Sequence, residues 1–373
     1  MTAKRHAGAF TSAFFAFFFV VAAMVAPLGA QQNADRVIVV TLDGMRWQEI
    51  FGGATRGLIT GPDGGVADTG FTLQRFWRDD LDQRRQALFP FLWGTVARKG
   101  LLLGDSTLGS AIRVTNGHRF SYPGYNELFS GAPDGRIDSN DKIPNPNVTV
   151  LEWLAGRPGF AHSVEIFGSW DVFPSIFNVG RSKLPVNGAG PPFPAPATER
   201  QRLVNQMAEW APTLWKNERL DLATMAAALD AMKTRHPRVL TVLLGETDEW
   251  AHERRYDLYL DAARRSDQFI QLLWETAQSM PEYRGRTSLI IATDHGRGSA
   301  RDWSDHGNDV LSAERIWMAA MGPKVASRGV ANDQPGTQSQ FAATIAKLVG
   351  EDWQSARPKA AGPIRVSADT RGN

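Results

Sequence analysis

The segment 288–307 contains the residues of this chain that are best suited to chemistry. An apolar run, 289–292, ends in Asp294 and His295, and His306 follows eleven residues after His295. A carboxylate and an imidazole supply the oxygen and nitrogen donors that divalent transition metals accept. We therefore interpret this segment as a buried strand that carries metal ligands at its end, and we expect further ligands from elsewhere in the chain.

Two other apolar runs end in acidic residues. Asp43 follows the β-branched run 36–42, and Asp248 follows the run 238–244. His252 comes four residues after Asp248, a spacing that places both side chains on one side of a helical turn. Because the carboxyl ends of parallel strands meet at one edge of a sheet, we expect these ligands to converge there.

The candidate ligands form two sets, each able to hold one divalent ion. The first set is Asp248, His252 and His306, and the second is Asp43, Asp294 and His295. Two metals about 3.5–4 Å apart can clamp the attacking and leaving oxygens of an in-line displacement at phosphorus. Sites rich in His suit zinc, although manganese and iron accept the same donors. The sequence therefore predicts two adjacent divalent ions, with zinc as the expected metal.

A Ser-x-Pro turn offers a nucleophile for such a centre. Pro123 suits the first turn of a helix and Gly131 suits its end, so Ser121 is predicted just before the N-terminus of a short helix. Negative charge is favoured at that end of a helix, which would help to hold the hydroxyl as an alkoxide. Ser and Pro are also common turn residues. The position of Ser121 between the first and second ligand motifs favours the catalytic interpretation.

Arg119 is a candidate for substrate binding because it lies two residues before Ser121. A guanidinium can bind the oxygens of a phosphate in a bidentate manner. The alternative is an ordinary surface salt bridge, which contributes little.

Strands and helices alternate around these motifs. Strands are expected at 36–42, 101–103, 111–114, 164–168, 238–244, 289–292 and 315–321, and helices at 83–99, 147–154, 220–235, 256–279 and 338–349, with Asn147 as a cap. This alternation predicts an α/β fold with a mostly parallel central sheet and helices on both faces. The Pro- and Gly-rich part of 134–212 predicts a cap insertion over one face of the domain.

Composition limits the classes of function that remain. The chain has 373 residues, 43% of them hydrophobic, which is enough for a large core. The absence of Cys excludes disulfides, thiolate metal sites and a cysteine nucleophile. A net charge of +2 gives no basic surface for nucleic acid or acidic membranes. The expected partner is a small molecule, and nucleic acid is not expected.

The first thirty residues have the pattern of a secretory signal peptide. Lys4 and Arg5 precede an apolar run that ends in small residues, with cleavage expected after Ala30. An uncleaved anchor is the alternative, since the apolar run is nearly long enough to span a bilayer. Cleavage predicts a periplasmic or secreted protein with no stable membrane association. We expect the folded domain at 31–355 and a C-terminal tail at 356–373.

The order of these motifs resembles that of the alkaline phosphatase superfamily, and most closely its type I phosphodiesterase/nucleotide pyrophosphatase branch. The motifs are Asp43-Gly44, Ser121-x-Pro123, Asp248-x-x-x-His252, Asp294-His295-Gly296 and His306-Gly307. The resemblance implies an alkaline-phosphatase-like fold with two metal ions, usually zinc. It also implies that Ser121 is both nucleophile and metal-bridging oxygen, and that a metal-activated water hydrolyses a phosphoseryl intermediate.

The chain departs from the patterns of this superfamily at two places. The phosphodiesterase branch commonly has Asn after the Pro of its nucleophile turn, where this chain has Gly124. Asn126 or Asn116 could then supply the amide that contacts the phosphate. Sulfatases of the superfamily have Arg where this chain has Tyr125, and Asp43-Gly44 lacks the paired Asp of many sulfatases. These departures argue against a sulfatase.

These patterns predict an exported, metal-dependent phosphoric ester hydrolase that acts on a small-molecule phosphate mono- or diester. The enzymatic alternatives are a sulfatase-like or phosphoglycerate-mutase-like member of the superfamily, and export argues against a glycolytic mutase. A third alternative is a binding protein that keeps the metals and has lost catalysis, which only Gly124 supports.

Overall fold

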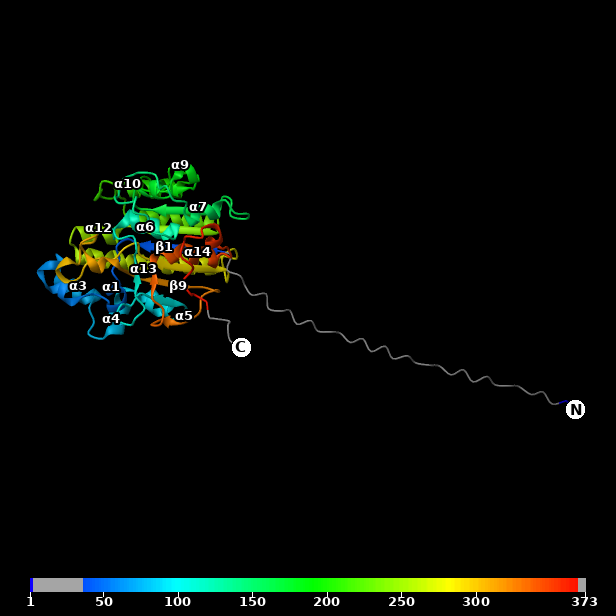
Figure 1. The fold of residues 1–373 in the computed structure, drawn as a ribbon, viewed down its shortest axis with the longest axis horizontal. Coiled ribbons are helices and arrows are strands. Elements are labelled where there is room, and N and C mark those ends of the chain that lie inside the picture. Colours follow the sequence, from blue (N-terminus) through cyan, green and yellow to red (C-terminus); the bar gives the residue numbers. More distant parts are fainter. Residues whose placement is uncertain (3–35, 368–373) are drawn as a thin grey trace. The chain divides into compact units, whose positions relative to one another are not determined.

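The structure is a computed structural model that describes residues 1–2 and 36–367. The predicted signal peptide therefore lies almost entirely outside the described residues. Within the described part, no helix combines the length and the apolar character needed to cross a membrane. Residues 36–367 form the folded body drawn in Figure 1.

A central eight-stranded sheet runs through this body in the order β10-β2-β9-β7-β1-β6-β4-β5. A smaller sheet has the order β11-β3-β8. The strands are β1 Arg36–Leu42, β2 Leu101–Leu103, β3 Ile112–Arg113, β4 Val164–Gly168, β5 Val186–Asn187, β6 Val239–Leu244, β7 Thr287–Ala292, β8 Arg315–Ile316, β9 Met318–Met321, β10 Gly329–Val330 and β11 Gly336–Thr337. In the large sheet only β9 runs antiparallel to its neighbours. The predicted mostly parallel sheet is confirmed.

Helices cover both faces of the large sheet. They are α1 Trp47–Gly52, α2 Arg56–Thr60, α3 Thr69–Phe76, α4 Leu81–Leu88, α5 Ala97–Lys99, α6 Ser121–Ser130, α7 Val150–Ala155, α8 Phe173–Ile176, α9 Val179–Ser182, α10 Glu199–Trp210, α11 Asp221–Thr234, α12 Glu246–His252, α13 Tyr256–Ser279, α14 Phe341–Leu348 and α15 Trp353–Ala356. In Figure 1, α6 and α7 lie on one side of β1, and α1 and α4 lie on the other. Alternate side chains of β1 enter different cores: Val37 and Val39 pack with α6, α7 and α14, whereas Ile38 and Val40 pack with α1, α4 and α13. A strand buried on both faces explains the continuous apolar run.

Three expected elements have different limits in the structure. The helix expected at 83–99 is broken after α4, because Pro90 has no N–H to continue it, and it resumes as a π-helical turn, Leu92–Val96, and α5. The strand expected at 315–321 divides at Trp317 into β8 and β9, which belong to different sheets. The helix expected at 338–349 begins with a 3-10 turn and is followed by a further helix, α15.

The predicted cap of α7 is also corrected. Thr149, not Asn147, precedes this helix, and its side chain accepts a hydrogen bond from the backbone N–H of Glu152 at 3.2 Å. Thr and Asn can both cap a helix, so only the backbone position of the first turn distinguishes them.

The predicted insertion at 134–212 contributes two strands to the central sheet. β4 pairs with β6, and β5 pairs with β4, so this part of the segment belongs to the core of the domain. By contrast, α10 has no buried residue. The role of the segment as a cap stays a prediction. In the predicted tail, Ile364 and Val366 are buried against the core, so the chain still packs beyond residue 355.

Candidate active site

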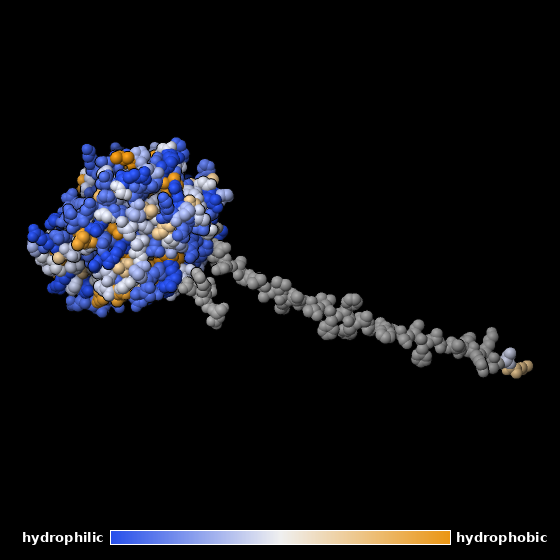
Figure 2. Space-filling model, viewed as in Figure 1, coloured by the Kyte–Doolittle hydropathy of each residue, from blue (hydrophilic) through white to orange (hydrophobic). Residues whose placement is uncertain are grey.

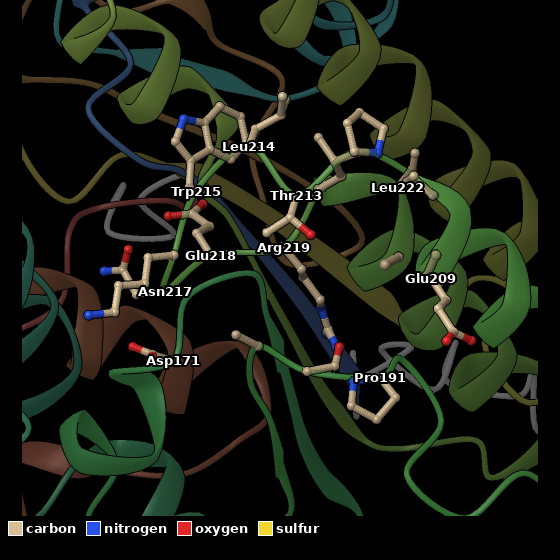
Figure 3. Close-up of a pocket in the computed structure, with 18 of the residues that line it drawn as sticks. Asp171, Pro191, Glu209, Thr213, Leu214, Trp215, Asn217, Glu218, Arg219 and Leu222 are labelled. Atoms are coloured by element: carbon tan, nitrogen blue, oxygen red, sulfur yellow. The ribbon is translucent and has the colours of Figure 1, made fainter.

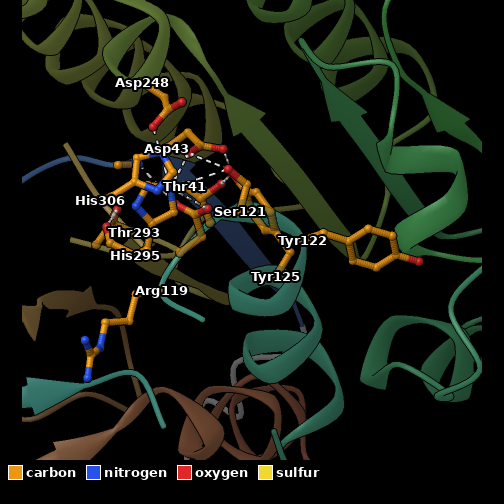
Figure 4. Close-up of polar contacts among 12 residues, drawn as sticks. Thr41, Asp43, Arg119, Ser121, Tyr122, Tyr125, Asp248, Thr293, His295 and His306 are labelled. Atoms are coloured by element: carbon orange, nitrogen blue, oxygen red, sulfur yellow. Dashed lines mark hydrogen bonds and ion pairs between the residues drawn. The ribbon is translucent and has the colours of Figure 1, made fainter. Parts of the chain in front are cut away.

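Three neighbouring strands deliver the candidate ligands to one edge of the sheet. β1 lies between β6 and β7, with Leu42 opposite Leu244 and Thr41 opposite Ala292. The strands therefore end at the same level. Asp43, Asp294 and His295 follow these ends directly, and α12 carries the other pair of ligands immediately after β6. The expected convergence is found, and Figure 4 shows Asp43, His295 and His306 beside Ser121.

The inner cluster consists of Asp43, Asp294 and His295. One ligand atom from each lies within 4.8 Å of the others, and all three residues are buried. The Nε2 atom of His295 is 3.3 Å from Oδ1 of Asp43 and 3.6 Å from Oδ2 of Asp294. Among the described residues, Oδ2 of Asp294 has no hydrogen-bond partner. A buried carboxylate oxygen without a partner is costly, so this donor set fits a cation.

Neighbouring groups fix the orientation of the inner ligands. The Tyr125 hydroxyl donates to Oδ2 of Asp43 at 3.1 Å, and the backbone N–H of Gly44 donates to Oδ1 of Asp294 at 3.1 Å. The Nδ1 atom of His295 is 2.9 Å from the carbonyl oxygen of Gly296, which leaves Nε2 directed into the cluster. Such outer contacts typically hold metal ligands in place.

The outer cluster consists of Asp248, His252 and His306, whose ligand atoms also lie within 4.8 Å of one another. The Nε2 atom of His252 is 3.0 Å from Oδ2 of Asp248 and 3.0 Å from Nε2 of His306. The His252 side chain is 49% exposed. The buried Arg297 side chain forms an ion pair with Oδ1 of Asp248. The outer cluster is thus more accessible than the inner one and already has a cationic neighbour.

The charges of the inner cluster interact strongly. Burial raises the pKa of Asp294 well above its ordinary range, and the neighbouring Asp43 carboxylate adds to this effect. Burial alone would lower the pKa of His295, but Asp294 and Asp43 outweigh it and raise that pKa to about 9. Without metal, the inner cluster therefore retains protons that divalent ions would replace.

In the outer cluster the pKa values shift downwards, opposite to those of the inner cluster. Burial and the neighbouring His295 lower the pKa of His306 to about 2. Burial would raise the pKa of Asp248, but Arg297 and His252 lower it well below its ordinary range. Both groups are therefore deprotonated, as metal ligands must be.

Ser121 lies beside the inner cluster, and it begins the helix that was predicted to start just after it. It is the first residue of α6, and its Oγ is 3.4 Å from both Oδ1 of Asp43 and Nε2 of His295. Gly131 ends the helix with a left-handed φ of 82°, as expected. The hydroxyl is buried and faces the ligands.

Gly124 is required by close contact between α6 and the end of β7. A Cβ atom at position 124 would lie 2.4 Å from the backbone oxygen of Asp294. Atoms cannot approach so closely, so an Asn at this position would force α6 away from the inner cluster. The departure from the phosphodiesterase pattern therefore coincides with the close packing of α6 against the end of β7.

The structure does not bring the two predicted substrate-binding residues to the nucleophile. Asn126 is fully buried, and its side-chain oxygen accepts hydrogen bonds from Asn145 at 3.2 Å and Asn147 at 3.0 Å. Arg119 donates to the carbonyl oxygen of Asn308 at 2.7 Å and points away from Ser121 in Figure 4. Its guanidinium is 4.0 Å from the carboxylate of Glu314, which is the salt bridge considered as the alternative.

The other Asn considered is also engaged elsewhere. The side chain of Asn116 bonds to Glu127 at 3.0 Å and accepts from the backbone N–H groups of His118 and Arg119. It therefore shapes the loop before α6 and is not free to contact a phosphate.

Asn140 is a polar residue that contacts the nucleophile turn and that sequence reasoning missed. Its side-chain oxygen accepts a hydrogen bond from the backbone N–H of Tyr122 at 3.0 Å, one residue after Ser121. The residue is exposed, and its amide nitrogen has no partner among residues 36–367. Asn140 belongs to the segment 134–212 that the sequence predicts as a cap insertion, and the composition of this segment gave no signal that one of its turns contacts α6.

Comparisons with known proteins agree with this geometry. Residues 73–369 match the family described as "Type I phosphodiesterase / nucleotide pyrophosphatase". No curated protein matches the chain. The matched region begins after Asp43 and includes the other candidate ligands and Ser121.

Several solved structures share the fold at low sequence identity. The alkaline phosphatase PafA has a TM-score of 0.56 at 10% identity, over 85% of this chain and 96% of that one. The 2-O GAG sulfatase BT1596 has a TM-score of 0.53 at 12% identity, over 91% and 76%. The lipoteichoic acid synthase LtaP from Listeria monocytogenes has a TM-score of 0.52 at 10% identity, over 91% and 76%. The alkaline-phosphatase-like fold is confirmed.

Proposed function

Because the chain belongs to the type I phosphodiesterase/nucleotide pyrophosphatase family and is an ester hydrolase, we propose that it is a two-metal phosphoric ester hydrolase with Ser121 as its nucleophile. One observation carries this proposal. The Ser121 hydroxyl lies 3.4 Å from two ligands of a buried cluster in which one carboxylate oxygen has no partner. A cation that satisfies this oxygen would also be close to the hydroxyl.

The chain would hold two ions with the two clusters described above. Divalent ions there would supply the positive charge that favours the Ser121 alkoxide and stabilises the departing oxygen. The Ser121 hydroxyl gives its proton to solvent and its Oγ attacks phosphorus, so that the Oγ–P bond forms as the bond from phosphorus to the ester oxygen breaks. The departing alkoxide takes a proton from solvent and leaves as the alcohol. A water molecule then breaks the Oγ–P bond and releases the phosphate product. The ligand types suit zinc, and they are also compatible with manganese and iron.

Asn140 would contact the phosphate in place of the amide missing at Gly124. Its side-chain oxygen accepts a hydrogen bond from the N–H of Tyr122, which leaves its amide nitrogen to contact the phosphate. An amide N–H beside the nucleophile can donate to a non-bridging oxygen as negative charge develops on it. This residue replaces Asn126 and Arg119 as our candidate for substrate binding.

Two features favour a phosphate ester over a sulfate ester. Tyr125 occupies the place of the sulfatase Arg, and its hydroxyl is committed to Asp43. The cluster also lacks the paired Asp at residue 44. From the sequence we further propose that the enzyme is exported. Its proposed substrates are small-molecule phosphate esters, either monoesters or diesters.

The Ser121→Ala variant tests the proposal. We expect it to retain both metals, measured by elemental mass spectrometry, and to lose at least about a thousandfold in kcat, since the covalent step is removed. The substrates are p-nitrophenyl phosphate, bis(p-nitrophenyl) phosphate and p-nitrophenyl sulfate. Near-normal hydrolysis by the variant would contradict the nucleophile assignment. Sulfate as the best substrate would support the sulfatase alternative, and inactivity of the metal-loaded wild type would support a binding protein.

A further inference from the structure

The outward face of α10 is apolar. Leu203, Met207 and Trp210 follow one another at spacings of four and three residues, so they form one stripe along the helix. Their exposed fractions are 50%, 54% and 74%. Figure 2 shows hydrophobic side chains at the surface in the upper part of the view, where Figure 1 places α10. An apolar stripe of this kind on the outside of a protein indicates an interaction surface.

Polar side chains attach the opposite face of α10 to the domain. The Gln201 amide donates to Asp230 of α11 at 2.9 Å. The Asn205 side chain accepts from the backbone N–H of Phe193 at 3.0 Å and donates to its carbonyl oxygen at 2.8 Å. Surface helices normally turn their apolar residues toward the core and their polar residues toward solvent. In α10 this arrangement is inverted, so the apolar stripe serves a contact outside the domain.

Two charged residues accompany the stripe on one flank of α10. Arg202 and Glu209 are seven residues apart, which is nearly two helical turns, so both project from the same side of the helix. Both are exposed, and neither side chain has a polar partner among the residues that the structure describes. Figure 3 shows Glu209 at the rim of the cleft between α10 and the segment 211–223. The two positions are separated by about 10 Å along the helix and do not pair with each other.

A second copy of this helix fits the stripe and the charges together. A two-fold axis beside Met207, near the middle of the stripe, pairs α10 with an antiparallel copy of itself. Leu203 of each copy is then level with Trp210 of the other. The same axis places Arg202 of each copy beside Glu209 of the other, offset by about 3 Å along the helix. The surface is therefore complementary to itself.

The charges also distinguish between the two directions of pairing. In a parallel pair, the flank that carries Arg202 faces the opposite flank of the second copy, where Arg200 lies at nearly the same level. Two guanidinium groups repel each other there, and Glu209 meets no cation of α10. In the antiparallel pair, each Arg202 meets a Glu209. Flanking charges of this kind set the orientation of paired helices.

A lipid surface fits α10 less well than a second copy does. Helices that lie on anionic membranes are rich in Lys and Arg on their polar face. α10 contains two acidic and two basic residues, so it has no excess of positive charge: Glu199, Arg200, Arg202 and Glu209.

We propose that the apolar face of α10 is the interface of a reversible homodimer, in which two α10 helices pack antiparallel about a two-fold axis beside Met207. One helical stripe is smaller than the interfaces of permanent dimers, so we expect a weak dimer with a Kd on the order of 10 µM. The inference does not depend on the proposed function, because it uses none of the metal ligands or Ser121.

Sedimentation velocity of the purified protein tests dimer formation. We expect the average mass to rise from monomer to dimer between about 1 and 200 µM. Leu203→Glu should weaken the dimer at least about tenfold, because it places a carboxylate against Trp210 and Glu209 of the second copy. Leu272→Glu is the matched control, since this exposed Leu lies on α13, and it should keep the wild-type Kd. A monomer at every concentration, or a Leu203→Glu variant that behaves like its control, would overturn the inference.

An exchange of charges tests the antiparallel direction. Arg202→Glu should weaken the dimer about three- to tenfold, and the added substitution Glu209→Arg should restore it, because the reversed charges again meet across the axis. The two positions are too far apart to compensate within one helix. Failure of the double variant to recover would overturn the antiparallel arrangement.

The absence of Cys from the chain allows a test of proximity. Gln206→Cys places one thiol of each copy next to the proposed axis, and Leu272→Cys places an exposed thiol on α13. A short bismaleimide should cross-link Gln206→Cys at least about tenfold faster than Leu272→Cys, because the paired thiols have a high effective concentration. Equal rates would overturn the inference.

Flotation with vesicles of phosphatidylglycerol and phosphatidylethanolamine distinguishes a second copy from a membrane. We expect the wild-type protein to remain unbound at concentrations where it dimerises. A monomeric protein that binds these vesicles, and loses this binding in Leu203→Glu, would overturn the inference and assign the face to a membrane.

Discussion

At the scale of single residues, the site depends on side chains that accept contacts from several directions. Asp43 illustrates this: its two carboxylate oxygens face Ser121, His295 and Tyr125, and its backbone oxygen accepts a hydrogen bond from Thr247 at 2.6 Å. Each contact restricts the conformations that are available to Asp43. A metal at this position would therefore meet a prearranged donor, which favours binding.

Asn140 provides a prediction at this scale. Asn140→Ala should lower kcat/KM for phosphate esters about 10- to 100-fold, because one hydrogen bond to a charged oxygen is lost. Asn140→Asp is the matched variant: it keeps an acceptor for the N–H of Tyr122 but replaces the free amide with negative charge. Steady-state kinetics should show a loss at least as large in the Asp variant. Wild-type rates in Asn140→Asp would mean that the residue only supports the turn.

Gly124 gives a second residue-scale prediction. Gly124→Asn restores the residue common in the family but places its Cβ against the backbone of Asp294. We expect about 1–3 kcal/mol of destabilisation, as in other overpacked sites, together with weaker binding of one metal. Urea unfolding and metal analysis measure both effects. Gly94→Ala is the control, because a Cβ there meets no atom within 4 Å, and a Gly124→Asn protein as stable as this control would contradict the packing explanation.

At the scale of elements, the connection from β7 to His306 sets the relation between the two clusters. It includes the 3-10 turn Ala300–Asp302 and the fully buried Trp303. The Trp303 ring contacts Tyr256 and Tyr259 of α13, with centroids 5.0 and 5.5 Å apart. Anchored in this way, the connection holds His306 at a fixed place beside the end of α12.

Separate metal sites are the prediction at this scale. His306→Ala should lower the metal content from two ions to one, because the inner cluster keeps all three of its ligands. Chelator titration followed by elemental analysis should also remove the outer ion first in the wild type, since His252 is half exposed and the inner ligands are buried. His118→Ala, outside both clusters, is the control. Simultaneous loss of both ions in His306→Ala would show that the division into two sites is wrong.

At the scale of the whole molecule, the buried charges of the inner cluster link stability to pH and metal. The metal-free folded state holds a proton on His295 up to about pH 9, whereas an unfolded His releases it near pH 6.5. Between these values the folded state binds more protons, so its stability must fall as the pH rises. The slope for one such group is at most about 1.4 kcal/mol per pH unit. Metal-loaded protein has no proton there to lose.

Thermal unfolding tests this linkage. With chelator present, the melting temperature should fall as the pH is raised from 7 to 9, and it should change much less with saturating zinc. The difference between the two preparations should therefore widen with pH. Parallel curves over this range would contradict the proposed protonation of the inner cluster.

The sequence by itself predicted the sheet strands that carry the candidate ligands, and it identified both candidate ligand sets and the Ser121 turn, which the structure brings together. These patterns are local, because an apolar run followed by a carboxylate or an imidazole can be recognised from neighbouring residues alone. The structure contains the corresponding strands β1, β6 and β7. The predicted α13 is also reproduced residue for residue, because a long amphipathic pattern needs no tertiary contact to be recognised.

Only the tertiary structure decided what surrounds these ligands. Gly124 is explained by the backbone of Asp294, 170 positions along the chain, and Asn140 reaches α6 from a turn that looks like surface. Contacts between distant segments follow from how strands pair and helices pack, and no local pattern of residues encodes that pairing.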